Sequence, residues 1–385
     1  MQLKEKNKFA ILASRLSQMF IHLKAYLFFF SFLLFVKPFL SNKSKSDSNN
    51  ILVVNTEKLG DIILALRFLQ NVIQSERESR IFLLVDEKYH SGIFCDEIQF
   101  KILPVNKKKY RTSIIYRTLT LLNLRKIGFK KIFNISPSRG IVNDELTLNS
   151  GEGFTACISQ QSKYLPNYIL KRNNLKYDYV IENDIKNEFT KLLYLFKQLY
   201  GNDFNHSTVE SFFLRCDKPN ENLPEKFIVI APASSDEIRN WTKENFRILS
   251  KQLSEKLPVY IIGTTEQIEI LNFISKDLKN VKSFAGTLKF SECVYMIKHT
   301  TLYIGLDSGF THLAHTCNRP YLAVIGGGNY ERFFPYPEYS NAEYNYYKLS
   351  CFNCQWNCIY EQPYCITLVS VDEVYSRCTK LIEKS

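Results

Sequence analysis

The chain has 385 residues, 45% of them hydrophobic and 23% charged, which is a globular composition long enough for two α/β domains. Lys and Arg number 50 against 38 Asp and Glu, and the formal net charge of +12 favours anionic partners such as phosphorylated ligands or an acidic membrane face. The basic residues are dispersed and no module that reads RNA or DNA occurs, which argues against a nucleic-acid partner.

The first fifty residues differ in kind from the rest. Basic residues precede an apolar stretch at 19–40, whose uninterrupted core, Ala25 to Val36, is shorter than the roughly 20 residues that span a bilayer. No small-residue cleavage site follows it. A monotopic anchor, a signal anchor and a buried packing helix remain open. Basic residues on both flanks favour membrane association from the cytoplasmic side, and 41–50 then forms a polar linker.

From residue 51 apolar runs alternate with amphipathic stretches, which is typical of a parallel, doubly wound sheet. Helices are expected at Asp61–Gln74 and Arg111–Ile127. The expected strands are Ile51–Asn55, Ile81–Asp86, Lys101–Val105 and Lys131–Ile135.

The stretch NTEKLGDIILALRFL, residues 55–69, follows the first strand. Gly60 is expected to permit a tight turn, and Asp61 to open the next helix. A carboxylate there is either favoured by the helix dipole or acts as a general base on a hydroxyl acceptor. One carboxylate suffices for an inverting, single-displacement reaction.

A second strand–helix series begins after the polar, proline-bearing linker 218–224, and two Rossmann-like domains facing a central cleft are the economical interpretation. Ligands of such sheets bind beyond the carboxyl ends of the strands. The expected strands of this series are 227–232, 258–263, 281–286, 301–307 and 320–325, and the expected helices are 242–256, 266–277, 290–298 and one from about Gly309.

The stretch APASSDEIRNWTKENF, residues 231–246, places Ser234, Ser235 and Arg239 after a strand. Hydroxyls and backbone N–H groups before a helix make an anion site, to which an arginine adds bidentate charge. A serine-rich loop with a surface arginine is the alternative.

In GLDSGFTHLAH, residues 305–315, Asp307 ends a strand and Ser308-Gly309 turns the chain into a helix. The stretch lacks the nucleophile elbow of hydrolases and the H-E-x-x-H spacing of zinc enzymes. An anion cradle fits better, with His312 donating to a phosphate. His315 is expected to be a buried packing residue.

Two further features have weaker patterns. Glu266 opens a helix after a strand and is either a ribose-binding acid or an ordinary first-turn acid. Ten cysteines in a cytoplasmic chain argue against a disulfide framework. Zinc, an iron–sulfur cluster, a redox-sensitive pair and unligated thiols all remain open for the cluster Cys351, Cys354, Cys358 and Cys365.

Taken together, these motifs resemble glycosyltransferase family 9, the heptosyltransferase-like enzymes of lipopolysaccharide core assembly. The likeness covers residues 51–383. It is carried by EKLGDIILAL, ASSDEIRNWTKENF, SFAGTLKFSECVYMIKHTTLYIGLDSGFTHLAH and the cysteine-rich segment, in that order. The resemblance implies a GT-B fold that holds its donor in the C-terminal domain, inverts configuration and needs no metal for transfer.

The resemblance also implies roles for single residues. Asp61 matches the family's catalytic base, with Lys58 and Gly60 beside it on the acceptor side. The sequence departs from the family's pattern at two positions near that side. Asn55 stands where many members have Arg or Lys, and Arg67 stands where proline is common. The implied donor contacts are Ser234, Ser235, Arg239 (usually lysine), Glu266, the base-packing Leu288, Asp307, Ser308, Gly309 and His312.

No Asp-x-Asp occurs, so positive charge from Arg239, His312 and helix N-termini is expected to stabilise the leaving diphosphate in place of a metal. The predicted function is inverting transfer of a heptose or related sugar, with ADP-heptose as the expected donor. The expected acceptor is lipopolysaccharide core or another lipid-linked glycan, on the cytoplasmic side of the inner membrane. A GT-B-type nucleotide-sugar epimerase and a non-catalytic nucleotide-sugar-binding protein are the alternatives.

The same patterns predict four parts of the chain. Residues 1–50 form the membrane-associating segment and linker, and 351–385 form a cysteine-rich segment with a C-terminal helix. Between them, 51–218 form the acceptor domain and 219–350 the donor domain.

Overall fold

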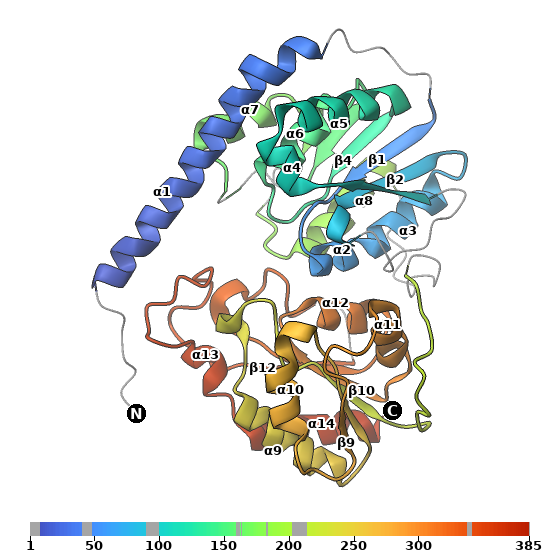
Figure 1. The fold of residues 1–385 in the computed structure, drawn as a ribbon, viewed down its shortest axis with the longest axis vertical. Helices are drawn as coiled ribbons and strands as arrows, with labels where there is room; N and C mark the ends of the chain where they lie inside the picture. Colours follow the sequence, from blue (N-terminus) through green and yellow to red (C-terminus); the bar gives the residue numbers. More distant parts are fainter. Residues whose placement is uncertain are drawn as a thin grey trace. The chain divides into compact units, whose positions relative to one another are not determined.

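Two parallel β-sheets organise the protein (Figure 1). The computed structural model describes residues 8–40, 48–89, 100–158, 162, 164–181, 184–201, 214–336 and 341–384. Leu12–Phe213 form one compact unit and Leu214–Ser385 form most of a second, and each is built around one sheet.

The first sheet has the strand order β3-β2-β1-β4-β5-β6, and its neighbouring strands are parallel. The central strand, β1, pairs with both β2 and β4, so the strand order reverses there. The strands are β1 (Asn50–Val54), β2 (Arg80–Asp86), β3 (Phe100–Val105), β4 (Lys131–Asn134), β5 (Phe154–Cys157) and β6 (Tyr179–Val180).

Helices cover both faces of this sheet, because side chains alternate along each strand and both faces are apolar. Leu52 and Val54 of β1 belong to the apolar cluster that also holds residues of α5 and α6. Phe68 of α3 stacks edge-on against Phe133 of β4 and Phe196 of α8. The helices are α2 (Leu59–Leu64), α3 (Leu66–Ser75), α4 (Lys107–Thr112), α5 (Ile114–Ile127), α6 (Ile141–Asn149), α7 (Asn167–Asn174) and α8 (Glu188–Tyr200), with the 3₁₀ turn η3 (Glu87–Tyr89).

The second sheet repeats the connections of the first, with the order β12-β11-β10-β7-β8-β9 and parallel pairing. Its strands are β7 (Ile228–Ile230), β8 (Val259–Ile261), β9 (Val281–Ser283), β10 (Leu302–Leu306), β11 (Tyr321–Val324) and β12 (Ala342–Asn345). Its helices are α9 (Lys243–Ser254), α10 (Ile268–Ser275), α11 (Phe290–His299), α12 (Gly309–Thr316), α13 (Tyr364–Thr367) and α14 (Val371–Glu383), with the 3₁₀ turns η4 (Glu237–Arg239), η5 (Thr265–Gln267) and η6 (Gly327–Asn329).

The C-terminal helix α14 belongs to the core of the second unit. Its buried residues Val374, Cys378 and Leu381 share one apolar cluster with β10 and β11. The indole of Trp241 donates a hydrogen bond to the carbonyl of Val369 at 3.1 Å, just before this helix. The last part of the chain therefore completes the fold of the unit.

The observed elements confirm the α/β class with two parallel sheets and an N-terminal apolar helix. The two long helices expected in the first unit are each divided, at Ala65 and at Ser113. Ser113 divides the second one because its hydroxyl accepts from the N–H of Tyr116 and caps α5. The sequence patterns missed three short strands, β5, β6 and β12, and the helices α6, α7 and α8.

The N-terminal apolar segment is helical through residue 39. It comprises α1 (Lys8–Ser31), a π-helical turn η1 (Phe32–Val36) and a 3₁₀ turn η2 (Lys37–Phe39). Within it, Leu16–Phe39 is long and apolar enough to cross a membrane by length and composition. One stripe of this segment, Ala25, Phe29, Phe32 and Val36, is buried at helical spacing.

A buried ion pair fastens this segment to the first unit. Arg117 of α5 bonds Glu145 of α6 through Nε at 2.6 Å and through Nη2, and both side chains are almost fully buried. The same guanidinium donates to the Ser31 hydroxyl at 2.9 Å and to the Phe28 carbonyl at 3.1 Å. Its carbon lies 3.6 Å from the centroid of the Phe28 ring, in cation–π geometry.

We predict that Arg117→Met destabilises the first unit and loosens α1. Removing one partner leaves the Glu145 carboxylate buried without its counter-charge, which costs about 3–5 kcal/mol. Urea denaturation measures the loss, and limited proteolysis near Ser31 measures release of the helix. The double variant R117M/E145L should recover most of the stability, and equal losses in the single and double variants would contradict this account.

Candidate functional site

Arg239 brings together two loops of the second unit that are far apart in the sequence. Its Nη1 donates to the backbone oxygen of Asp307 at 3.0 Å and lies 3.8 Å from the carboxylate oxygen Oδ1. Its Nη2 donates to the hydroxyl of Ser235 at 3.0 Å. The turn after β7 and the turn after β10 therefore meet at one guanidinium, at the carboxyl ends of adjacent parallel strands.

The α12 N-terminus lies at this junction. Ser308 is the N-cap residue in extended conformation, with no side-chain cap hydrogen bond, and Gly309 is the first helical residue. Unpaired backbone N–H groups of a first helical turn attract anions. The arrangement supplies a guanidinium and a helix start at one place, as the sequence motifs predicted.

Two buried polar atoms here have no hydrogen-bond partner of standard geometry among the described residues. They are Nε of Arg239 and Oγ of Ser308. The Ser308 hydroxyl also interacts with Tyr303, where it offsets part of the burial that raises the pKa of that phenol. Buried polar atoms in native proteins are nearly always satisfied, so such a pair marks a place where a ligand or water would bind. The predicted anion cradle fits both observations.

His312 lies in the first turn of α12, in an aromatic enclosure. Its ring stacks on Phe334 at 4.6 Å, and its Nδ1 is 2.7 Å from the hydroxyl of Tyr336. Burial and, to a lesser degree, the charge of Arg239 lower the pKa of His312 to about 3. The expectation that His312 contributes positive charge is wrong, because burial disfavours the imidazolium. A neutral ring can still donate one N–H.

His315, one helical turn further on, is a packing residue as expected. Its ring lies 3.5 Å from the Tyr336 ring in parallel stacking and meets Tyr321 edge-on at 6.2 Å.

Ser234 shapes the turn after β7. Its hydroxyl donates to the carbonyl of Asp236 at 2.7 Å, and its N–H donates to Oδ1 of Asn240 at 2.8 Å. The side chain is thus engaged within its own turn and holds Ser235 and Arg239 in place. The predicted diphosphate contact of Ser234 remains a prediction.

Glu266 and Leu288 lie in the two adjoining loops. Glu266 is exposed in η5, and a hydrogen bond from Thr264 lowers its pKa. Leu288 is half-buried between β9 and α11. The two loops pack closely at Gly286, which has φ +64° and whose missing Cβ would lie 2.8 Å from Cα of Thr265. The predicted ribose and base contacts therefore come from neighbouring loops, and their roles remain predictions.

Asp61 lies in the first unit, in the first turn of α2, where it is half-buried. Asn55, fully buried at the end of β1, fixes the approach to it: its amide donates to the Asp61 carbonyl at 3.1 Å and accepts from the N–H of Glu57 at 3.3 Å. Asn55, which stands where many family members have Arg or Lys, therefore holds the backbone at the predicted base through its side-chain amide.

The expected tight turn at Gly60 is not found. The helix begins at Leu59, so Gly60 is its second residue, and its φ is not positive. Lys58 is the exposed N-cap residue, in extended conformation. The chain instead bends at Glu57, whose N–H donates to the Asn55 side-chain oxygen.

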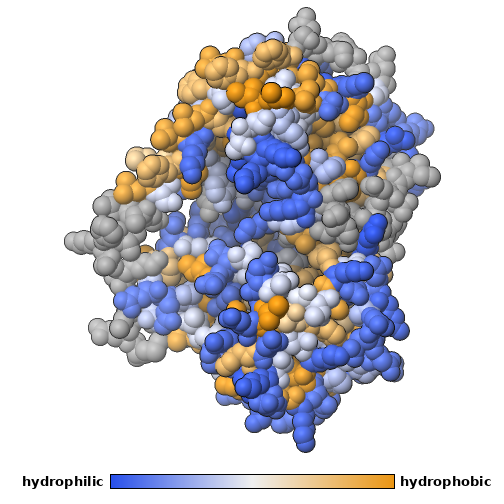
Figure 2. Space-filling view, viewed as in Figure 1, coloured by the Kyte–Doolittle hydropathy of each residue, from blue (hydrophilic) through white to orange (hydrophobic). Residues whose placement is uncertain are grey.

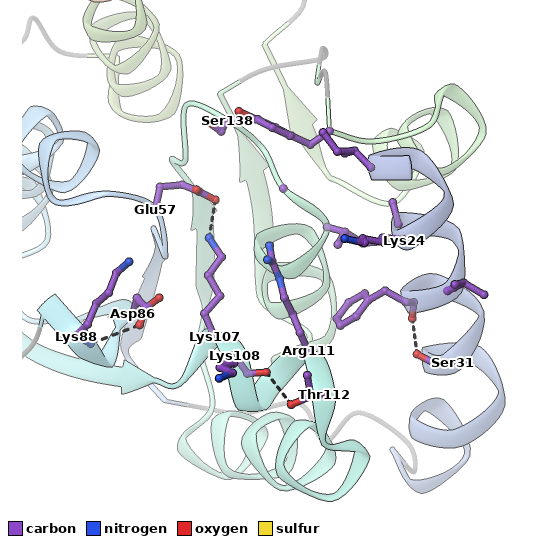
Figure 3. A pocket seen from close by; sticks show the side chains of 17 residues that line it. Lys24, Ser31, Glu57, Asp86, Lys88, Lys107, Lys108, Arg111, Thr112 and Ser138 are labelled. Atoms are coloured by element: carbon purple, nitrogen blue, oxygen red, sulfur yellow. Dashed lines mark hydrogen bonds and ion pairs between the residues drawn. The ribbon is translucent and has the colours of Figure 1, made fainter. Parts of the chain in front are cut away.

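A cavity of about 960 Å³ occupies the same end of the first sheet (Figure 3). Glu57 follows β1, Asp86 ends β2 and Lys107 follows β3, so the cavity lies beyond the carboxyl ends of parallel strands. Lys107 donates to Glu57 at 3.1 Å and to the carbonyl of Thr56 at 2.9 Å. The sequence patterns did not predict this site, because along the sequence the lysines at 107–109 are only part of a dispersed basic charge.

A buried polar network fixes the wall of this cavity after β4. Arg139, fully buried with φ +38°, donates to Asp144 at 3.1 Å. Asp144 also accepts from Asn134 at 3.1 Å, Asn173 at 2.9 Å and Tyr177 at 2.9 Å. The flanking residues of Arg139 line the cavity, so the network holds that backbone in a conformation few residues adopt.

The cysteine-rich segment wraps a glycine turn at the end of β11. Asn353 donates to the carbonyl of Gly327 at 2.7 Å, and Gly327 donates to the Cys365 sulfur at 3.3 Å. Burial raises the pKa of the Cys365 thiol to about 11. None of the nine described cysteines forms a disulfide, and the described residues contain no group of three or more His, Cys, Asp or Glu side chains that could hold a metal ion. The zinc or iron–sulfur prediction remains a prediction.

Comparison with known proteins gives one family and several related structures. The profile for glycosyltransferase family 9 (heptosyltransferase) matches residues 156–360. Lipopolysaccharide heptosyltransferase 1 of Campylobacter coli is 26% identical over an alignment of 317 residues, which covers 76% of this chain and 86% of that protein.

Two solved structures have a similar fold. The family 9 glycosyltransferase of Veillonella parvula has a TM-score of 0.70 at 16% identity, covering 89% of this chain and 100% of its own. E. coli heptosyltransferase WaaC with ADP-2-deoxy-2-fluoro heptose has a TM-score of 0.60 at 16% identity, covering 77% and 92%. These likenesses show the fold.

We predict that Arg239→Ala weakens binding of ADP about 10- to 100-fold. The change removes a charge-assisted contact, worth about 1.5–3 kcal/mol, and releases Ser235 and Asp307. Arg239→Lys should bind ADP with intermediate affinity, because lysine keeps the positive charge but lacks the planar set of N–H donors of a guanidinium. Isothermal titration calorimetry measures the affinities. Arg377→Ala, which removes a partly exposed arginine of α14, is the control, and equal ADP affinity in Arg239→Ala and wild type would contradict the site.

We predict that His312 makes the protein less stable as the pH falls. The unfolded chain binds this proton near pH 6.5 and the folded chain only near pH 3, so protonation favours unfolding below pH 6.5. The free energy of unfolding should drop by about 2 kcal/mol from pH 7 to pH 5 through this group. Urea denaturation at both pH values should show a smaller drop in His312→Gln than in wild type.

The exposed His299 gives the matched control for this measurement. His299→Gln should show the wild-type drop. A drop of the same size in His312→Gln and wild type would contradict the buried, neutral state of His312.

Proposed function

Because the chain belongs to glycosyltransferase family 9, whose profile matches more than half of it, we propose that it transfers a heptose from ADP-heptose to a lipid-linked glycan. The chain is a glycosyltransferase of the GT-B fold. ADP-heptose is supported by the E. coli WaaC structure with an ADP-heptose analogue, and a lipopolysaccharide acceptor by the name of the Campylobacter coli relative.

The observation that carries the donor side is the Arg239 junction. Leaving of a nucleoside diphosphate develops negative charge on the β-phosphate, and a guanidinium beside a helix N-terminus stabilises that charge. Arg239 and the start of α12 supply both, with Ser235 and Ser308 as hydroxyl donors. Asp307 accepts from hydroxyl groups of the donor in this proposal, and Glu266 and Leu288 serve the ribose and the base.

On the acceptor side, Asp61 acts as the general base. Its carboxylate takes the proton of the acceptor hydroxyl while that oxygen bonds to the anomeric carbon of the heptose. The bond from the anomeric carbon to the diphosphate oxygen breaks, and the pair of electrons leaves with ADP. A single displacement of this kind inverts the anomeric configuration.

The two alternatives predict different products. An epimerase would convert the donor without any acceptor, and a binding protein would hold the donor without turnover. The Gly60-Asp61 pair and the Asp307–His312 stretch, both matched to the family's motifs, are present, which favours transfer over binding alone. The family match favours transfer over epimerisation.

We place the enzyme on the cytoplasmic side of the inner membrane, as a peripheral or monotopic protein. The apolar segment Leu16–Phe39 supports association with lipid, and the excess of basic residues supports an anionic surface.

We predict that Asp61→Asn lowers kcat by about 100- to 10,000-fold, because the amide cannot take the acceptor proton. ADP should bind with unchanged affinity, since Asp61 belongs to the other unit from the Arg239 junction. Turnover is measured with ADP-heptose and extracted lipopolysaccharide core acceptor by release of ADP.

Two further variants make this test specific. Asp277→Asn alters an exposed carboxylate with φ +58°, a conformation that asparagine also tolerates, and should keep full turnover. Glu57→Gln tests the other carboxylate near the turn. If Asp61→Asn keeps near-wild-type turnover and Glu57→Gln loses turnover, the general base is Glu57 and not Asp61.

A further inference from the structure

The helical segment at the N-terminus presents a second apolar face, opposite the buried one. Its large hydrophobic side chains recur at three- and four-residue spacing and are between 45% and 67% exposed. Figure 2 shows hydrophobic side chains gathered along this helix. The exposed set, here called the outer face, is Leu16, Met19, Phe20, Leu23, Phe30, Leu34, Phe35 and Phe39.

A helix on the surface of a water-soluble domain has a polar outer face, so this one requires an apolar partner. α5, which packs beside η1, adds exposed Ile115, Leu119 and Leu122 at the same kind of spacing. Apolar side chains interleaved with cations match an anionic lipid surface. Among the exposed cations of this region, Lys37 lies on the segment itself, whereas Lys24 of the segment and Lys108 and Arg111 of α4 also line the cavity described below.

The packing of the segment opposes a transmembrane orientation. Its middle, Phe29 and Phe32, is buried against side chains of the first unit. Arg117 bonds the Phe28 carbonyl and the Ser31 hydroxyl there. A helix that crossed the hydrocarbon core could not pack its middle turns on a domain with charged surfaces. The segment is therefore fitted to lie along an interface.

The side of α1 that meets the domain forms one wall of the 960 Å³ cavity. Six of the cavity's lining residues come from α1, among them Lys24, Phe28 and Ser31. Figure 3 shows Lys24 on this helix, opposite Glu57 and Lys107 from the sheet edge.

The cavity is cationic. Five basic side chains line it against two carboxylates, and one of these, Glu57, is paired with Lys107. Cations at this density favour a ligand with phosphate or carboxylate groups. The five basic residues are Lys24, Lys88, Lys107, Lys108 and Arg111.

We propose that the segment Leu16–Phe39 lies in the plane of an anionic bilayer surface, with its outer face in lipid and its other side walling a cationic pocket. The pocket takes the phosphate or carboxylate groups of the membrane-borne acceptor. The segment thereby serves as anchor and as part of the acceptor site. This inference rests on the proposed function for the identity of the ligand as acceptor.

The membrane part is tested by flotation of the full chain with vesicles. Wild type should float with phosphatidylcholine vesicles that contain phosphatidylglycerol, and alkaline carbonate should extract it. The triple variant F20S/L23S/L34S should lose at least 10-fold of its vesicle binding, whereas Ile248→Ser, at an exposed residue of α9, should not. Resistance to carbonate would overturn the in-plane orientation, and a soluble wild-type dimer that the triple variant dissociates would overturn lipid as the occupant.

The pocket is tested by steady-state kinetics with one acceptor in two forms, intact in vesicles and de-acylated in solution. Lys24→Glu and Arg111→Glu should raise the acceptor KM at least 10-fold for both forms, with kcat within about 3-fold of wild type. The triple variant should raise KM for the vesicle form alone. Lys251→Glu, an exposed reversal on α9, is the charge control.

The outcomes separate this inference from the proposed function. Wild type that transfers heptose to neither form contradicts the proposed function. Transfer by wild type with an unchanged KM in both charge reversals overturns the pocket. If the triple variant raises the KM for the soluble acceptor as much as the KM for the vesicle-bound acceptor, the separate role of the outer face is overturned.

Discussion

The parallel pairing of both sheets is the constraint on which the rest of the structure depends. Strands buried on both faces leave little room for polar side chains within the sheet, so polar groups gather where the strands end. Residues with predicted or observed chemistry follow the carboxyl ends of β1, β2, β3, β7 and β10. The two sheets have the same order of connections, and each gathers its own set of charged loops.

The two sets differ in the way their charges are held. In the second unit a single guanidinium, Arg239, joins two loops, and its Nε and the nearby Ser308 hydroxyl have no partner of standard geometry among the described residues. In the first unit several lysines and Arg111 surround a cavity, and Lys107 is held by Glu57. The planar guanidinium of Arg239 has donors in fixed positions, which suits a diphosphate of constant shape. The lysine side chains are flexible, which suits an acceptor of larger and more varied form.

The Arg117–Glu145 pair connects these features to the N-terminal segment. Glu145 holds the guanidinium where it reaches the Phe28 carbonyl and the Ser31 hydroxyl, which gives α1 its polar attachment to the domain. The wall of the cavity and the exposure of the outer face both follow from this attachment. A buried charge pair costs solvation energy, and here it fixes one orientation of an otherwise apolar helix.

Local sequence patterns were enough to predict the fold class and the approximate place of the chemistry. Strand–helix alternation predicted both sheets, and turns after apolar runs located the loops at Arg239 and Asp307. The strands β5, β6 and β12 were not predicted because none of them contains a run of three apolar residues, such as the run Ile228–Ile230 that marks the equally short β7. The low pKa of His312 was also not predicted, because Phe334 and Tyr336, which help to bury the ring, are far from it in the sequence.

The sequence by itself determined the α/β class, the family and the candidate residues, since these depend on short-range spacing and residue type. Only the tertiary structure decided which residues act together. Arg239 reaches Asp307 across 68 positions, and the cavity joins residues from Ile21 to Tyr164. Such contacts depend on the order in which strands pair and on which face of a helix is buried. Those are properties of the whole packed chain, because burial of apolar surface is shared among distant segments.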